Sequence, residues 1–227
     1  MRKFYKSTIG IAAAGLLVAG LAGCSTAEAT PVESASPSSE AQVDPEPLAS
    51  IPALDGVDTQ VTLDAGFLEA LTTLGLTPGV LGTATLSPEG VLAFPITGGN
   101  VDYYDPEEDY RPYVQGSIVH DGSGISLTAG ETVVELTDFR IDPGTSQLFG
   151  TVTLNDELVG NDIFIFNLDG TTLNPLETDA DGNAVLEGTT VLISTDAAAL
   201  LNETFGTDAV TDQLVVGIAK ITAKAAA

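Results

Sequence analysis

The sequence predicts an all-β domain, either an antiparallel β-sandwich or a partly open barrel, with two short helices. Past residue 54, short runs rich in Val, Ile, Thr and Phe are separated by Gly, Asp, Asn and Pro, which is typical of strands joined by tight turns. Many short strands at regular spacing favour a sandwich or a barrel. Two segments show a helical period instead and supply the two helices.

The strand-like runs are read directly from this composition. The expected strands cover residues 80–87, 91–97, 113–120, 124–129, 131–142, 147–154, 162–168, 184–188, 189–194 and 213–222. Within the fifth run, one apolar phase ends at Leu136 and another begins at Phe139. A phase change in a strand predicts a bulge, here near Thr137 and Asp138.

The two helical segments resemble each other. One runs from Asp64 to Gly75 and the other from Asp196 to Gly206, so each has an Asp near its start and a Gly at its end. Asp caps free amides, and Gly suits the left-handed residue that follows a helix. Either the helices plug opposite ends of a sandwich, or they form a pair that frames a pocket.

The first part of the chain has the layout of an export signal. Residues 1–23 contain a basic start and an apolar stretch that is too short to span a bilayer. The sequence "LAGC" covers the end of this segment and Cys24. This pattern resembles the lipobox of bacterial lipoproteins. The resemblance implies cleavage before Cys24, lipidation of its sulfur, and attachment to the outer face of the plasma membrane. The alternative is an incidental cysteine after an ordinary signal peptide.

A tether and one domain follow the signal peptide of residues 1–23. Residues 24–54 are rich in Ser, Ala, Pro and Glu, and we expect them to be disordered because they bury too little apolar surface. Residues 55–227 have the size of a single domain. If Cys24 is lipidated, no thiol remains for a disulfide, a metal site or catalysis.

The charge excludes some partners. The chain has 32 acidic and 7 basic residues, and such a surface repels nucleic acid and anionic lipid headgroups. The acidity indicates either simple solubility or binding of cations or a basic partner. The catalytic inventory is thin, with a single His and no nucleophile motif. Paired carboxylates remain the route to a hydrolase.

Four tyrosines and the only histidine lie close together in the sequence. Tyr103, Tyr104 and Tyr110 belong to an acidic segment, and we expect them either to hold a flat ligand or partner or to cover the domain edge. His120 lies in phase with apolar residues of a strand, just before the turn-like "DGSG". It is either a core histidine bonded to backbone or Asp121, or a ligand of a metal or haem.

A possible calcium site lies further on. Asp179, Asp181 and Asn183 alternate around a glycine and offer three oxygen ligands in one turn. The same residue types also form tight β-turns, so a solvated turn is the alternative.

The central stretch "LAFPITGGNVDYY…HDGSGISLTAGETVVELTDFRID…LFGTV" resembles the HtaA family, β-rich domains on actinobacterial surfaces that bind haem. The shared pattern is an apolar "FP" strand, a Gly-Gly turn, a variable loop, a "GSI" strand and a Gly-rich turn. The resemblance implies the fold and a haem-binding role. The family's ligating tyrosine falls at Ala70 here, and its histidine falls in the turn of residues 122–124, where this chain has Ser123.

These features together predict a lipid-anchored surface protein with a non-enzymatic binding module. The expected ligand is haem or another small apolar molecule, and a surface protein is the other expected partner. The alternatives are an envelope hydrolase that uses carboxylates and a purely structural envelope protein. A hydrolase requires a concave pocket with perturbed carboxylates.

Overall fold

The computed structural model describes residues 45–226, which form thirteen strands, two α-helices and one 3₁₀ helix. The signal peptide, Cys24 and most of the tether lie outside the described residues. The strands are β1 (Ala49–Ile51), β2 (Leu54–Leu63), β3 (Thr77–Gly82), β4 (Thr85–Leu86), β5 (Val91–Pro95), β6 (Gly98–Tyr103), β7 (Val114–Ala129), β8 (Thr132–Asp142), β9 (Gln147–Leu154), β10 (Glu157–Asp169), β11 (Glu177–Thr178), β12 (Ala184–Ile193) and β13 (Val215–Ala225). The helices are α1 (Ala65–Leu74), η1 (Gly170–Thr172) and α2 (Thr195–Phe205).

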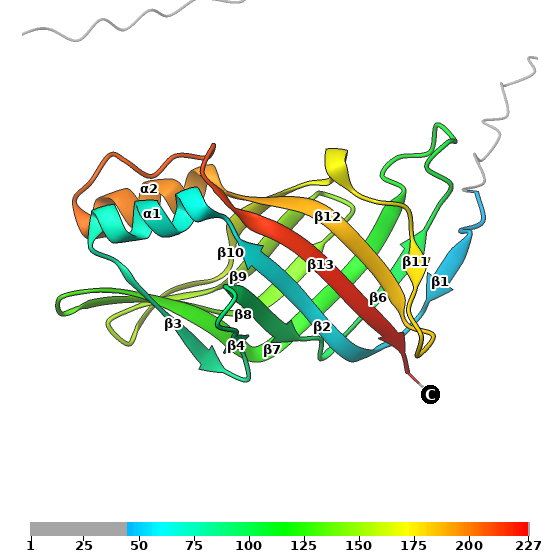
Figure 1. The fold of residues 1–227 in the computed structure, drawn as a ribbon, viewed down its shortest axis with the longest axis horizontal. Coiled ribbons are helices and arrows are strands. Elements are labelled where there is room, and N and C mark those ends of the chain that lie inside the picture. Colours follow the sequence, from blue (N-terminus) through cyan, green and yellow to red (C-terminus); the bar gives the residue numbers. More distant parts are fainter. Residues whose placement is uncertain (1–44, 227) are drawn as a thin grey trace, which may run out of the picture. The chain divides into compact units, whose positions relative to one another are not determined.

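All thirteen strands belong to one antiparallel sheet, which curls into a half-barrel (Figure 1). The order along it is β1-β6-β7-β8-β9-β10-β12-β13-β2-β5-β4, while β3 adds to β7 and β11 adds to β12. The predicted all-β class with two short helices is confirmed. Of the two architectures that the sequence left open, the structure has the partly open barrel, because one curled sheet encloses the core by itself.

Both helices cover the same end of the half-barrel, so the interpretation that they plug opposite ends is wrong. Leu71 of α1 and Leu201 of α2 border one small apolar gap above the sheet, and Figure 1 shows the two helices side by side. Asp64 caps α1 through its bond from the Gly66 amide. In α2 the cap is Ser194 rather than Asp196, because the Ser194 oxygen accepts from the Ala197 amide.

The bulge predicted at Thr137 and Asp138 is confirmed. The β8–β9 register shifts between Thr137 and Arg140, and Asp138 has a positive φ of 52°. The "DGSG" segment is not a hairpin turn, because β7 continues through it with a register shift between His120 and Gly124. The Asp138 carboxylate accepts a hydrogen bond from the Gly122 amide, so the two irregularities support each other. Both lie beside His120.

Among the described residues, regular structure begins before residue 54, the predicted end of the tether. Ala49–Ile51 forms β1, which pairs with β6 from Val101 to Tyr103. Ile51 also contributes to the apolar interior. This part of the expected tether therefore belongs to the sheet, because β1 pairs with an otherwise open sheet edge and Ile51 is partly buried.

Among the described residues, no helix is long and apolar enough to cross a membrane.

Candidate functional site

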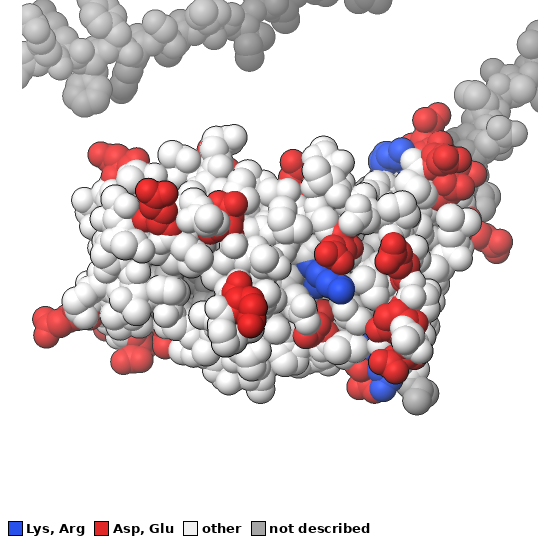
Figure 2. Space-filling view, viewed as in Figure 1, with Lys and Arg blue, Asp and Glu red and all other residues white. Residues whose placement is uncertain are grey.

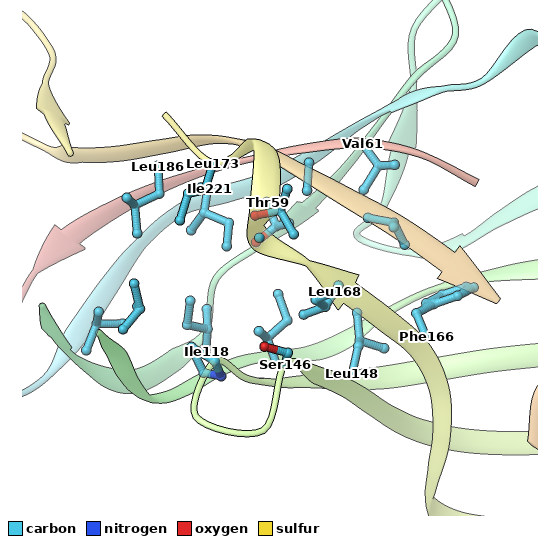
Figure 3. A pocket seen from close by; sticks show the side chains of 18 of the residues that line it. Thr59, Val61, Ile118, Ser146, Leu148, Phe166, Leu168, Leu173, Leu186 and Ile221 are labelled. Carbon is cyan, nitrogen blue, oxygen red and sulfur yellow. The ribbon is translucent and has the colours of Figure 1, made fainter. Parts of the chain in front are cut away.

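The interior of the half-barrel, away from the helices, contains a cavity of about 760 Å³. This volume lies within the range of small-molecule sites. Figure 3 shows the cavity with Thr59, Val61 and Ile221 on one side and Ile118, Leu148 and Leu168 on the other. Because most lining groups are apolar, the cavity suits an apolar ligand.

Strand alternation and small side chains create this space. On β13, Ala219, Ile221 and Ala223 point inward at a spacing of two, whereas Ile218 lies on the outer face and is exposed. The two alanines leave room where larger residues would fill the interior. Phe94, Phe139 and Phe166 close the inner end; the Phe94 and Phe139 rings meet edge to face with centroids 5.3 Å apart.

His120 is one of the few polar groups in the cavity wall. Its imidazole is 1% exposed; Nδ1 lies 3.2 Å from the Phe139 carbonyl oxygen and Nε2 lies 2.8 Å from the Thr59 hydroxyl oxygen. Burial lowers the pKa of His120 to about 4, although the bond to Phe139 acts in the opposite direction. The ring is therefore neutral at pH 7.

The geometry fixes the direction of these bonds. A carbonyl oxygen only accepts, so Nδ1 of His120 carries the proton and donates to Phe139. In a neutral imidazole the other nitrogen is then an acceptor, and Thr59 donates its hydroxyl proton to Nε2. The Thr59 oxygen keeps its lone pairs and can accept a further hydrogen bond.

The loop between β6 and β7 forms part of the cavity mouth. Arg111, Pro112 and Tyr113 line the opening, together with Asp169 and Thr171 near η1. Burial raises the pKa of Tyr113, and the neighbouring Tyr103 phenol adds to this effect, so Tyr113 remains a neutral phenol.

The predicted tyrosine site is arranged as two pairs. Tyr103 is buried and its ring meets Tyr113 edge to face at 6.0 Å, whereas the rings of Tyr104 and Tyr110 lie 4.7 Å apart. Of these four residues, Tyr113 borders the cavity. The loop tyrosines thus pack on one another and support the rim.

Arg111 holds the loop rather than presenting a free cation. Its guanidinium donates to the carbonyl oxygens of Tyr110, at 2.9 Å, and Pro106, at 2.8 Å, and also to that of Glu108. The same group lies 5.6 Å from the centre of the Tyr113 ring. Most of its donors are therefore engaged within the loop.

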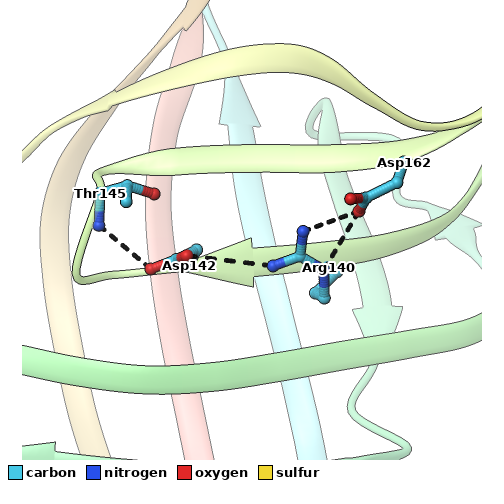
Figure 4. A network of polar contacts seen from close by, with 4 residues as sticks. All are labelled: Arg140, Asp142, Thr145 and Asp162. Atoms are coloured by element: carbon cyan, nitrogen blue, oxygen red, sulfur yellow. Dashed lines mark hydrogen bonds and ion pairs between the residues drawn. The ribbon is translucent and has the colours of Figure 1, made fainter.

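A second polar network supports the turn between β8 and β9, which lies beside the β6–β7 loop at Pro112 (Figure 4). Asp142 accepts a hydrogen bond from the Thr145 amide at 3.0 Å and lies 4.0 Å from Arg140. Arg140 also contacts Asp162 at 2.7 Å. This network fixes the turn that carries Ser146, and Ser146 lines the cavity.

The surface around the mouth is acidic. Figure 2 shows many Asp and Glu side chains on the visible face and few Lys or Arg. Among the lining residues that the structure describes, Asp169 is the single carboxylate. A hydrogen bond from the Thr171 amide lowers its pKa. The cavity thus offers none of the paired carboxylates that a glycoside hydrolase needs.

The carboxylate of Asp179 serves its own turn. Its Oδ1 accepts from the amides of Asp181 and Asn183, and its Oδ2 accepts from the Asn183 side chain. These bonds lower the pKa of Asp179, that from the Asn183 side chain most strongly. Within residues 45–226, no group of three or more His, Cys, Asp or Glu side chains is arranged to hold a metal ion. Asp179 thus closes a turn, and the calcium site at Asp179, Asp181 and Asn183 stays a prediction.

The fold is similar to that of a known domain. The C-terminal domain of HtaA from Corynebacterium glutamicum superposes with a TM-score of 0.50 and 16% sequence identity, over 77% of this chain and 99% of that domain. At this identity the likeness establishes an HtaA-like fold and no more. No family model matches the sequence, and no curated protein matches it.

The HtaA resemblance implies haem, but the cavity residues do not fit iron coordination. An iron atom at Nε2 of His120 would have to displace Thr59, which lies 2.8 Å away and is itself buried. The raised pKa of Tyr113 disfavours the phenolate that would bind iron. At the family's two ligand positions, Ala70 lies on α1 and Ser123 is buried, with its hydroxyl donating to the His120 carbonyl. These described residues therefore offer haem iron no available ligand.

Sequence reasoning missed two residues of this site. Tyr113 lay in the predicted aromatic segment but was not separated from the other tyrosines. Thr59 is a single threonine within a strand, and no sequence motif marks it as a site residue. Its hydrogen-bond partner His120 lies 61 residues away in the chain. Pairing of this kind arises from the curl of the sheet, which the local pattern does not encode.

Proposed function

We propose that this domain binds a small apolar ligand, without catalysis, in the interior of the half-barrel. The observation that carries the proposal is the cavity of about 760 Å³, whose wall is almost wholly apolar and whose lining includes residues of two supported loops. Contact between water and an apolar cavity wall is unfavourable in free energy. Transfer of an apolar molecule from water into the cavity is favourable by about 0.8 kcal/mol for each buried methylene. The HtaA-like fold supports a binding module.

The location of the protein is part of the same proposal. The lipobox-like sequence before Cys24 supports lipid anchoring on the outer face of the plasma membrane. A lipid anchor on Cys24 would keep the cavity near a source of apolar molecules. The acidic surface favours a domain that stands off anionic headgroups rather than lying on them.

The direct test uses N-phenyl-1-naphthylamine, a neutral probe that fluoresces in apolar surroundings. We expect the purified full chain to bind one probe molecule saturably. Ala219→Phe fills the cavity from β13 and should weaken binding at least about tenfold, while the domain stays folded because the new ring occupies existing space.

Ile218→Phe is the matched control, because Ile218 is the preceding residue and lies on the exposed outer face. It should leave probe binding unchanged. Equal loss of binding in both variants, or no loss in Ala219→Phe with a retained melting transition, would contradict an interior site.

A further inference from the structure

The deepest polar point of the cavity has a defined hydrogen-bonding character. Thr59 is 4% exposed and His120 is 1% exposed, whereas Thr189 of the lining is partly buried and Ser146, Asp169 and Thr171 are exposed. Thr59 and His120 are therefore the most deeply buried polar residues of the lining, and a ligand that fills the interior contacts the Thr59 hydroxyl.

This point offers an acceptor and no donor. The carbonyl of Phe139 takes the His120 Nδ1 proton, and Nε2 takes the single hydroxyl proton of Thr59. The Thr59 oxygen is left with lone pairs only. An incoming carbonyl, ether or carboxylate oxygen would face another acceptor, whereas a hydroxyl or N–H group would complete the chain of hydrogen bonds.

Charge at the mouth disfavours an anionic ligand. The rim loop carries Asp105, Glu107, Glu108 and Asp109, and Asp169 borders the opening. Arg111 is the cation at the opening, and carbonyl oxygens of its own loop engage its guanidinium. A carboxylate or phosphate headgroup would therefore meet an excess of carboxylates there, and the donors of Arg111 are mostly engaged within its own loop.

We infer that the ligand is a neutral apolar molecule with one hydrogen-bond donor, such as a long-chain alcohol, and that the Thr59 oxygen accepts that hydrogen bond. This inference rests on the proposed function and adds the chemistry of the ligand. Thr59 and His120 then act together as the specificity-determining pair, with His120 fixing the direction in which the Thr59 hydroxyl points.

The experiment compares two isomers that differ in donor capacity. Dodecan-1-ol and methyl undecyl ether contain the same atoms, but only the alcohol donates a hydrogen bond. Each displaces N-phenyl-1-naphthylamine from the purified full chain, and the quantity measured is the ratio of their inhibition constants. One hydrogen bond to a buried acceptor predicts a preference of roughly three- to tenfold for the alcohol.

Variants isolate the contribution of the Thr59 hydroxyl. In Thr59→Val the ratio should fall by the same roughly three- to tenfold factor, since a methyl group replaces the acceptor. Thr59→Ser keeps the hydroxyl and should keep the ratio. Thr222→Val is the matched control, because Thr222 is a buried threonine of β13 outside the cavity lining. Comparing ratios between variants cancels the different aqueous solubilities of the two compounds.

The outcomes separate the inference from the proposed function. If both isomers displace the probe but the ratio is the same in the wild type and Thr59→Val, the inference is wrong while the interior site stands. If the probe binds but neither isomer displaces it, the inference is again wrong while the interior site stands. If no probe binds, the proposed function is wrong and the inference with it. A folded Thr59→Val chain that loses the alcohol preference, while Thr222→Val keeps it, is the supporting result.

Discussion

The Nε2 atom of His120 on β7 and the hydroxyl oxygen of Thr59 on β2 lie 2.8 Å apart, although 61 residues separate them in the chain. The two strands are not neighbours in the sheet, so this hydrogen bond crosses the interior of the half-barrel. It joins the strands near the two open margins of the sheet and places a polar pair within an apolar wall. Structure and binding therefore depend on the same contact.

The protonation of His120 is the first prediction. The chain has a single histidine, so its imidazole resonances are unambiguous in an NMR titration. We expect the neutral ring with its proton on Nδ1 at pH 7 and a titration midpoint near 4. A midpoint near the ordinary value of about 6.5, or a proton on Nε2, would contradict the hydrogen-bond assignment.

The same shift predicts how stability depends on pH. Because the pKa of His120 is lower in the folded than in the unfolded chain, the unfolded state binds more protons between about pH 6.5 and pH 4. The contribution of His120 to the free energy of unfolding is complete above pH 6.5. It is lost as the pH falls toward 4, by about 3 kcal/mol in total. Chemical unfolding of the wild type and His120→Phe should show this difference, since carboxylate effects are common to both. Parallel pH profiles would count against it.

The close approach of Gly116 to β6 sets the spacing of β6 and β7. Gly116 has a φ of +120°, and a Cβ there would lie 2.1 Å from the Asn100 carbonyl oxygen. Gly116→Ala should therefore destabilise the domain by about 2 kcal/mol or more. Gly98→Ala, in the same pair of strands, meets no atom within 4 Å and should change stability by less than about 0.5 kcal/mol. Similar unfolding midpoints for both variants would refute this reading.

The sequence encodes the local features of this fold better than its closure. The cap at Asp64, the glycines that end both helices and the bulge at Asp138 follow from local backbone preferences, and the structure has all of them. The turn predicted at "DGSG" was wrong. Its composition suits a turn, but β7 continues through the segment because it pairs with β3 and β8.

The candidate site was only partly visible in the sequence. The apolar phase of the strand that ends at His120 indicated an inward-facing imidazole, and the structure places it there. The alanines that open the cavity and the partner Thr59 belong to strands distant in sequence. Their role depends on how far the sheet curls, and single strands carry no record of that curvature.

Haem binding distinguishes this account from the one that the HtaA resemblance implies. A haem titration of the full chain should give at most weak absorbance changes that His120→Phe and Tyr113→Phe leave unaltered, because neither residue offers a free axial ligand. A stoichiometric Soret band that either substitution abolishes would show that the cavity rearranges to coordinate iron.

Lipid anchoring makes a separate prediction about Cys24, which lies outside the described residues. Cys24→Ser should prevent lipidation and release the protein from the detergent-requiring membrane fraction, because the acyl chains supply the anchoring energy. The folded domain should keep its melting temperature. An unchanged membrane fraction for the variant would contradict the lipobox interpretation.

The location of a bound ligand distinguishes binding in the interior of the half-barrel from binding on its outer surface. In an NMR experiment on the full chain with dodecan-1-ol, we expect intermolecular nuclear Overhauser effects from the ligand methylenes to the methyl groups of Val61, Ile118 and Ile221 in the cavity wall. Effects confined to exposed methyl groups, such as those of Leu158 and Val159 on β10, would place the ligand outside the half-barrel and contradict the proposed function.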